Sequence, residues 1–544
     1  MATPFIPTNE QSSAIDSDAS MVITACAGSG KTKVIVEKIR KELKNLKNHE
    51  GIIGITFTVK ASKELKKKCG ADAFDIKRSF FGTIDHFCLS EIILPFFTRI
   101  FEIERTNIVC ITYSELDDKF KENLPDLNAS GVVFTTDHYD LYHNEFSRHL
   151  ENGFVLLEAV GVIANKIVEA SSACQRYLLA RYTSVYVDEY QDSSQSQHKL
   201  FLNLIGIGLR GIAVGDTQQS IYAWRGGSPM HIQELVARRD LFEHHFINMN
   251  HRCHPSIINY SNRLFSPGCK LHNAESLRVF HRSFNGTQID LATALNTYIP
   301  QTAEIYEVKS LHEVAVLVRN NQSLRYLRDG LNIPNRIYTD DALSAINTRA
   351  TNLFSDLLKY RFDPNFLIND VTEFERIGNK LSTIKIKDIR KSISQLSELN
   401  NDQLENKIID LALSLLHGEI SEKEISALRD VINNPDMIAQ YSPGSKEEVQ
   451  VMTLHKSKGL EFEIVFHLDM YEWIFPHRQF SRDFNNPVYP TWDQELNLHY
   501  VGITRARTAC ILAYSNQRLN SLGEIKKADR SAFLDLVALN GLFG

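Results

Sequence analysis

Apolar and polar residues alternate along this chain in two patterns that predict different elements. MVITA (21–25) and the apolar part of SVYVDEYQDSS (184–194) are short runs typical of buried strands. Helical spacing of apolar residues instead marks KVIVEKIRKEL (33–43), LFSDLLKY (353–360), EFERIGNKLS (373–382), SISQLSEL (392–399) and KIIDLALSLL (407–416). The first part of the chain is therefore predicted to mix strands and helices, and the region 353–416 to be helical.

Composition adds size and setting to this picture. At 544 residues the chain is too long for one hydrophobic core, so several domains are expected. The hydrophobic content of 43% and charged content of 23% are typical of a globular protein. The net charge of −6 excludes a generally basic nucleic-acid binder, so any site for a polyanion must be local.

The cysteines and the apolar runs favour a cytoplasmic protein. The eight cysteines contain no CxxC pair, and hence no zinc or iron–sulfur spacing, which fits a reducing cytoplasm. The N-terminus, MATPFIPTNEQ, lacks the pattern of a secretory signal. The best candidate for a membrane span, FVLLEAVGVIA (154–164), is short and contains Glu158. No membrane function is expected.

The segment CAGSGKT (26–32) lies between the predicted strand at 21–25 and the predicted helix at 33–43. Glycines in such a loop let backbone N–H groups converge on phosphate oxygens, while Lys31 reaches the terminal phosphates and Thr32 offers its hydroxyl to Mg²⁺. The alternative is a glycine turn that only joins a strand to a helix. The predicted nucleotide-binding residues here are Ala25, Cys26, Ala27, Gly28, Ser29, Gly30, Lys31, Thr32 and Lys33.

Acidic residues after the next predicted strand supply the rest of the chemistry. Asp188 is placed to hold Mg²⁺, and Glu189 can position or deprotonate an attacking water, although adjacent acids at a strand end can also form a solvated turn. Gln11 is a candidate for the adenine edge, with a surface position as its alternative. Arg252 and Arg505 could stabilise a phosphoryl-transfer transition state, yet most arginines are ordinary surface residues.

Ten stretches then occur in a fixed order: TNEQ, ACAGSGKT, TFTVKASKEL, GTIDHF, VDEYQD, VGDTQQSIYAWRGG, NHRCHP, EVAVLVRNN, VMTLHKSKGLEFEIVF and YVGITRARTA. This set resembles the superfamily 1A DNA helicases of the UvrD/Rep/PcrA type. The resemblance implies an α/β fold with two RecA-like parallel-sheet motor domains, which bind ATP with Mg²⁺ and carry single-stranded DNA, typically moving 3′ to 5′.

Two segments between motifs are too long for loops, at about 90 and about 130 residues, and should be inserted subdomains. The expected division is a motor domain 1A over 1–88 and 181–245 with a mainly helical insertion 1B over 89–180. A motor domain 2A follows over 246–345 and 446–544, with a reduced helical insertion 2B over 346–445.

The resemblance also implies residue roles. Gln219 is similar to the glutamine that senses the γ-phosphate, Arg252 and Arg505 to two arginine fingers, and Glu461 to the ribose contact, with His251 and Gly459 completing the nucleotide set. Positions that match DNA contacts are Phe57, Lys60, Thr83, His86, Tyr222, Trp224, Arg225, His455 and Lys458. For Phe57 a packed core position is the alternative.

Several residues depart from the family pattern: Cys26, Lys33, Val59 and His251. The family usually has an aromatic ring at the position of His251 and an arginine at the position of Lys33. His251 and Lys33 should bind the base less tightly than those residues, so nucleotide affinity and base selectivity are in question.

The function predicted from these residues is a DNA-stimulated, Mg²⁺-dependent ATPase that translocates on, or unwinds, single-stranded or tailed duplex DNA in anti-phage defence or DNA repair. The chain is also similar in size and motifs to the helicase-like subunits of Gabija anti-phage systems, which pair with an ATPase–nuclease subunit. The alternative is therefore a nucleic-acid sensor that activates a partner nuclease. A catalytically dead scaffold is disfavoured by the intact Lys31, Asp188, Glu189, Arg252 and Arg505.

Overall fold

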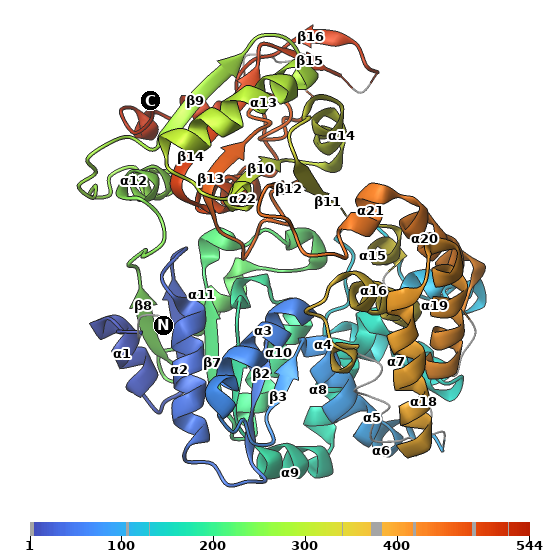
Figure 1. Cartoon of the computed structure of the whole chain (residues 1–544). Coiled ribbons are helices and arrows are strands. Elements are labelled where there is room, and N and C mark those ends of the chain that lie inside the picture. The colour runs from blue at the N-terminus through green and yellow to red at the C-terminus, as the bar shows by residue number, and fades with distance from the viewer. Residues whose placement is uncertain are drawn as a thin grey trace. The chain divides into compact units, whose positions relative to one another are not determined.

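The computed structural model of the chain describes residues 5–104, 108–129, 131–339, 341–346, 348–371, 383–416, 420–480, 486–520 and 522–544. The chain folds into two compact units. The first unit comprises residues 1–253 with 493–501, and the second comprises residues 254–492 with 502–544. Each unit is built on its own six-stranded sheet, and both sheets are labelled in Figure 1.

The sheet of the first unit has the strand order β3-β2-β6-β7-β1-β8, and every neighbouring pair is parallel. Parallel strands place all their carboxyl ends at one edge of the sheet, where ligands usually bind. The strands are β1 (Met21–Ala25), β2 (Gly51–Ile55), β3 (Phe80–Gly82), β6 (Tyr182–Val187), β7 (Arg210–Gly215) and β8 (Glu243–Ile247).

Apolar side chains leave this sheet on both faces. Met21 and Ile23 of β1 pack into one core with α2, whereas Val22 between them packs into a second core with α10 and α11. This alternation explains why β1 is apolar at nearly every position. The helices on the two faces are α1 (Asn9–Asp16), α2 (Lys31–Leu43), α3 (Val59–Cys69), α10 (Gln195–Gly206) and α11 (Pro229–Ala237).

The chain between β3 and β6 is mainly helical. Its two short strands, β4 (Val109–Ile111) and β5 (Phe154–Leu156), pair in parallel. Its helices are α4 (Ile84–Phe87), α5 (Leu94–Phe96), α6 (Thr98–Phe101), α7 (His138–Glu151), α8 (Val160–Ala170) and α9 (Ser172–Arg181), with a π-helical turn over Cys88–Ile93. Phe97, Phe146 and Ile163 from this region join the core beneath α10.

The second unit repeats the architecture with the strand order β11-β12-β10-β13-β14-β9, again parallel throughout. Its strands are β9 (Val279–Phe284), β10 (Val314–Val318), β11 (Asn335–Tyr338), β12 (Val449–Thr453), β13 (Phe462–His467) and β14 (Ala506–Ser515), followed by an antiparallel pair, β15 (Gln517–Leu519) and β16 (Ile525–Lys527). Its helices include α12 (Pro255–Arg263), α13 (Gln288–Ile305) and α14 (Asn321–Gly330), and α22 (Trp492–Ile503) contributes residues to both units.

Between β11 and β12 the described residues form helices around a separate apolar core that includes Phe354, Leu411 and Leu428. Figure 1 shows these helices in yellow to orange: α15 (Ala342–Ile346), α16 (Arg349–Phe362), α18 (Thr383–Ser394), α19 (Asn401–Leu416), α20 (Glu422–Asn433) and α21 (Pro435–Ala439). The helices predicted at 353–360 and 407–416 are confirmed within α16 and α19. The segment 392–399 spans the end of α18 and a 3₁₀ turn, and the predicted helix at 373–382 lies outside the described residues.

The predicted fold class is confirmed, because two parallel α/β sheets each carry a mainly helical insertion. The residue boundaries given for the four segments stay predictions. Within the described part of the chain, no helix combines the length and the apolar character needed to cross a membrane.

Candidate functional site

The predicted phosphate loop joins the end of β1 to the start of α2, as the sequence indicated. Gly28 and Gly30 have positive φ angles of 69° and 81°, a conformation that favours glycine. A Cβ atom on Gly28 would lie 2.4 Å from Asn250 Oδ1 and 2.7 Å from Arg252 Cβ, so a side chain there would displace its neighbours. Gly28 therefore meets both a conformational and a packing requirement.

Gln11 is buried, which rules out the surface position considered for it. Its amide nitrogen donates to the Ser29 carbonyl at 2.9 Å, and its amide oxygen accepts from the Thr8 N–H at 2.9 Å, closing a capping box on α1. Gln11 thus connects the first helix to the phosphate loop. Its predicted contact with adenine stays a prediction.

An ion pair crosses the carboxyl edge of the sheet between β1 and its neighbour β7. Lys31 Nζ lies 3.9 Å from Asp216 Oδ2, and the same oxygen accepts from Gln219 Nε2 at 2.7 Å. Burial raises the pKa of the Asp216 carboxyl, while the nearby Lys31 lowers it. Asp216 was missing from the predicted site, although its position directly after a buried strand is the same signal that identified Asp188.

Asp188 and Glu189 follow β6 at the same edge. Glu189 has a φ of 54°, and its N–H donates to Asp188 Oδ1 at 2.9 Å. A left-handed conformation in a residue other than glycine is strained and often occurs at functional sites. Gln191 connects this turn to β7, because its amide donates to Glu189 Oε2 at 2.6 Å and accepts from the Asp216 N–H at 3.0 Å.

One pocket of the first unit contains both predicted kinds of site. Asp188 and Glu189, predicted for hydrolysis, line it together with Phe57 and Thr83, predicted for DNA. Asp85 also lines this pocket, and burial raises the pKa of its carboxyl to about 6.

Residues 247–253 run beside the phosphate loop. The His251 N–H donates to the Gly28 carbonyl at 3.0 Å, and the Cys26 thiol donates to the Asn248 carbonyl at 3.2 Å. Asn250 Oδ1 accepts from the N–H groups of Arg252 and Cys253. This arrangement brings His251 and Arg252 to the loop. Asn250 was not predicted, because no local pattern marked it.

Cys26, Lys33 and Val59 are three of the departures from the family pattern. Burial raises the pKa of Cys26 to about 12, with a further contribution from Asp216, so this residue stays a neutral thiol at neutral pH. Lys33 is exposed, and its ammonium lies 5.6 Å from the ring centroid of Phe5. Val59, at the start of α3, is 54% exposed.

Residues 493–501 of α22 bring a distant segment to the first unit. The Ala27 N–H donates to the buried Tyr500 hydroxyl at 3.3 Å. Asn497 and Gln494 donate from the same side of the helix to the carbonyls of Ser220 and Ile221, at 3.0 and 3.4 Å. One helix face therefore contacts both the phosphate loop and the segment that follows Gln219.

The aromatic residues predicted for DNA form a small cluster. The rings of Phe57 and Tyr222 stack at 4.9 Å with an interplanar angle of 16°, and Trp224 meets Tyr222 edge-on at 6.4 Å. Trp224 is 48% exposed. Tyr222 thus contacts a protein ring on one side, while Trp224 offers the more accessible surface. The placement of the Arg225 side chain lies outside the described atoms.

The other three predicted DNA residues of this unit are Lys60, Thr83 and His86. Lys60 is exposed on α3. The Thr83 hydroxyl caps α4 by accepting from the His86 N–H at 3.4 Å, and the His86 ring is tilted against Phe80 at 5.2 Å.

The remaining predicted residues belong to the second unit. Arg505 is 2% exposed and donates to the Leu460 carbonyl at 2.9 Å, while Glu461 pairs with Arg507. His455, Lys458 and Gly459 lie in the turn between β12 and β13, and Gly459 has a φ of 85°. This set is distinct from the set in the first unit, which comprises Gln11, residues 25–33, Asp188, Glu189, Gln219, His251 and Arg252.

Comparison with known proteins supplies the family context for this geometry. Residues 341–517 match the UvrD-like helicase C-terminal domain, and residues 11–225 match an AAA domain. The predicted resemblance to UvrD-like helicases is confirmed. The first match covers the helical insertion and the strands β12, β13 and β14 of the second sheet, and the second match covers the phosphate loop, Asp188 and Tyr222.

Three relatives align along nearly the whole chain. The Gabija protein GajB of Bacillus cereus is 28% identical over 530 residues, covering 93% of this chain and 94% of the relative. The ATP-dependent DNA helicase Rep of Buchnera aphidicola is 26% identical over 616 residues, covering 92% and 91%. The ATP-dependent DNA helicase PcrA of Staphylococcus epidermidis is 24% identical over 629 residues, covering 94% and 83%.

The lengths of these alignments distinguish the relatives. The Rep and PcrA alignments are longer than the 544 residues of this chain, so both helicases carry inserted segments that it lacks. The GajB alignment is shorter than the chain and requires only short insertions in the relative. The predicted similarity to Gabija subunits is supported by this difference.

Proposed function

We propose that the chain is a Mg²⁺-dependent ATPase that is stimulated by DNA and moves 3′ to 5′ along a single strand, with duplex unwinding where the strand leads into a duplex. The relatives named ATP-dependent DNA helicase support ATP and DNA as ligands. The direction of movement follows from the resemblance to UvrD-like helicases alone.

One observation carries the proposal. Residues 216–222 connect the predicted ATP site to the predicted DNA site. At one end, Asp216 contacts both Gln219 and Lys31. At the other end, Tyr222 stacks on Phe57. The carbonyls of Ser220 and Ile221 between them are held by side chains of α22. A short segment fixed at both ends can transmit a change at the phosphates to the aromatic cluster.

In this proposal the residues act as follows. Lys31 leaves Asp216 to bind the terminal phosphates, Thr32 and Asp188 would hold Mg²⁺, and Glu189 positions the attacking water. Arg252 supports the transition-state charge, and Arg505 is assigned the role of a second arginine finger on the resemblance to UvrD-like helicases alone. Mg²⁺ would neutralise charge on the phosphate oxygens.

On the DNA side, the exposed ring of Trp224 stacks on a base, and Lys60 binds a phosphate. Neither contact reads a base edge, so binding should depend little on sequence.

The decisive experiment compares ATP turnover with and without single-stranded DNA, and then strand separation on duplexes with a 3′ or a 5′ tail. The proposal predicts strong stimulation by DNA and separation of the 3′-tailed substrate. Absence of stimulation would contradict it, and separation of only the 5′-tailed duplex would reverse the assigned direction.

A second function is favoured by the match to the Gabija protein and by the segments that are absent relative to Rep and PcrA. In this version the chain senses DNA ends or single strands, and its ATP turnover activates a partner nuclease without extensive unwinding. Strong stimulation by DNA without strand separation, together with a partner nuclease whose cleavage depends on this ATPase, would select the second function.

A further inference from the structure

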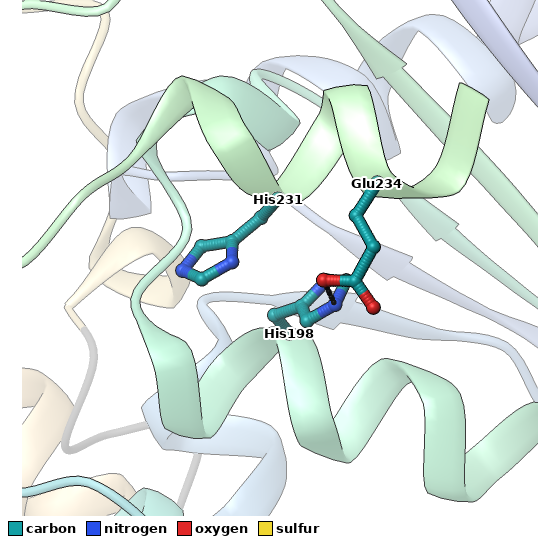
Figure 2. Close-up of side chains that lie close together, drawn as sticks. All are labelled: His198, His231 and Glu234. Carbon is teal, nitrogen blue, oxygen red and sulfur yellow. Dashed lines mark ion pairs between the residues drawn. The ribbon is translucent and has the colours of Figure 1, made fainter. Parts of the chain in front are cut away.

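Three metal-ligating side chains meet between α10 and α11, in a place that the proposed ATPase does not use. His198 Nε2 lies 3.2 Å from Glu234 Oε2, and the rings of His198 and His231 stack at 4.7 Å with an interplanar angle of 14°. One ligand atom from each residue lies within 4.8 Å of the others. Figure 2 shows His231 and Glu234 extending from one helix toward His198 on the other.

We propose that His198, His231 and Glu234 form a binding site for one divalent transition-metal ion of the zinc class. Two imidazole nitrogens and one carboxylate oxygen are a ligand set that Zn²⁺ accepts, with a fourth position for water. Mg²⁺ and Ca²⁺ prefer oxygen ligands, so the two histidines select against both ions.

His198 is prepared for this role by its surroundings. It is 6% exposed, and its Nδ1 lies 2.9 Å from the hydroxyl of the buried Tyr190. When the Nδ1–H donates to that hydroxyl, the lone pair of Nε2 is directed toward Glu234, as in many metal-bound histidines. Among the described residues, Nε2 makes no well-aligned hydrogen bond in spite of its short distance to Glu234.

The two other ligands have the freedom that binding requires. Zinc–nitrogen bonds of about 2.0–2.1 Å lie in the plane of each imidazole, so stacked rings cannot both bind one ion. His231 is half-buried and Glu234 is 53% exposed on its side chain, so both can turn toward the fixed Nε2 of His198.

An ion bound at this site would connect two helices of the first unit. Helix α10 follows the Asp188–Glu189 turn, and α11 follows the segment that carries Gln219 and Tyr222. A bound ion would cross-link these two helices, and its ligand His198 contacts Tyr190 in the VDEYQD stretch. The proposal nevertheless stands independently of the ATPase, because the ligands are outside the nucleotide and DNA sets.

The test uses the full-length chain without a polyhistidine tag, stripped of metal and kept in excess Mg²⁺. Zn²⁺ is titrated against a chromogenic chelator, and Co²⁺ is added separately to record its visible absorption. We expect one Zn²⁺ per chain, a Co²⁺ spectrum typical of nitrogen and oxygen ligands, and a melting temperature raised by about 5 °C at a hundredfold excess over Kd.

Variants locate the ion. His231→Ala and Glu234→Gln change accessible positions, and each should weaken Zn²⁺ binding by at least about 100-fold, whereas Tyr190→Phe should weaken it by about 10- to 100-fold. His245→Ala is the matched control, because His245 pairs with Glu243 at the same 3.2 Å but lies outside the cluster. The proposal is overturned if the wild-type chain binds no Zn²⁺ under these conditions, or if His231→Ala and Glu234→Gln bind it as tightly as wild type.

Discussion

Glu189 shows at the residue scale how a local strain serves the site. Its left-handed backbone turns the chain directly after β6, and the amide of Gln191 holds its carboxylate. Such a conformation costs about 1–3 kcal/mol and persists only where neighbouring contacts enforce it. Here the contacts come from the Asp188 carboxylate, which accepts from the Glu189 N–H, and from Gln191.

Replacement of Glu189 by glutamine tests whether this residue activates the attacking water. Glu189→Gln keeps the shape and removes the base, so ATP should still bind while turnover with DNA falls by about 100- to 10,000-fold. Nucleotide binding and steady-state turnover are measured on the same preparation. Glu64→Gln, an exposed change on α3, is the control, and near-normal turnover in Glu189→Gln would refute the assignment.

Trp224 and Tyr222 differ in how much ring surface is available to stack on a base. Because Tyr222 already stacks on Phe57 and Trp224 is 48% exposed, Trp224→Ala should remove a stacking surface. Affinity for single-stranded DNA should fall by about 1–3 kcal/mol, roughly 5- to 150-fold, with most of the basal ATPase retained. Fluorescence anisotropy with an oligonucleotide measures the loss.

The matched control for this change is Phe246→Ala, which removes another exposed aromatic ring of the same unit outside the predicted DNA set. A Trp224→Ala chain that loses basal ATPase and melting temperature in parallel would show that the ring serves the core instead.

At the scale of elements, the loop between β1 and α2 depends on the segment 247–253 that lies against it. Gly28→Ala would add a Cβ atom to a residue with a left-handed backbone conformation. That atom would clash with Asn250 and Arg252. We expect nucleotide affinity to fall at least about 10-fold, since left-handed strain alone costs about 1–2 kcal/mol and the displaced neighbours add to it.

Gly131→Ala separates the effect of backbone strain from the effect of the clash with neighbouring residues. Gly131 has a φ of 81°, and a Cβ atom added there would have no atom of the described residues within 4 Å. This control should lower stability slightly and leave nucleotide binding unchanged. Equal nucleotide affinity in Gly28→Ala and wild type, measured with a fluorescent ATP analogue, would argue against a phosphate-binding role for this loop.

The elements also show what the sequence could predict. The strand at 21–25, the helix after it and the acidic turn after β6 depend on local patterns, and they were predicted correctly. The contacts of Tyr500 with Ala27 and of Asn497 with Ser220 join residues more than 270 positions apart, and no local pattern encodes such a pairing. The same limit applies to Asn250, whose importance depends on a tertiary contact with Gly28.

At the scale of the whole chain, the buried residue His467 should make the stability of the protein depend on pH. His467 in β13 is fully buried, and burial lowers its pKa to about 4. Between pH 4 and 6.5 the unfolded chain binds the proton that the folded chain excludes, so the free energy of unfolding falls as the pH falls through this window. The loss attributable to His467 should approach about 3 kcal/mol.

This dependence is measured by denaturant unfolding across the pH range in which His467 titrates in the unfolded chain. His467→Asn should flatten the slope whatever its effect on absolute stability, whereas His49→Asn, at an exposed position, should leave the slope unchanged. An unchanged slope in His467→Asn would show that other groups control the acid response.

At the scale of the whole molecule, we propose that residues 216–222 couple ATP turnover to DNA binding. Gln219 is buried and bonded to Asp216, whereas its neighbour Gln218 is half-buried, which provides a matched pair of changes. The most direct measurement is the ratio of ATP turnover with and without saturating single-stranded DNA in Gln219→Ala and Gln218→Ala, with binding of both ligands verified. We predict that the ratio falls toward one in Gln219→Ala and stays at the wild-type value in Gln218→Ala, and a wild-type ratio in Gln219→Ala would contradict the coupling.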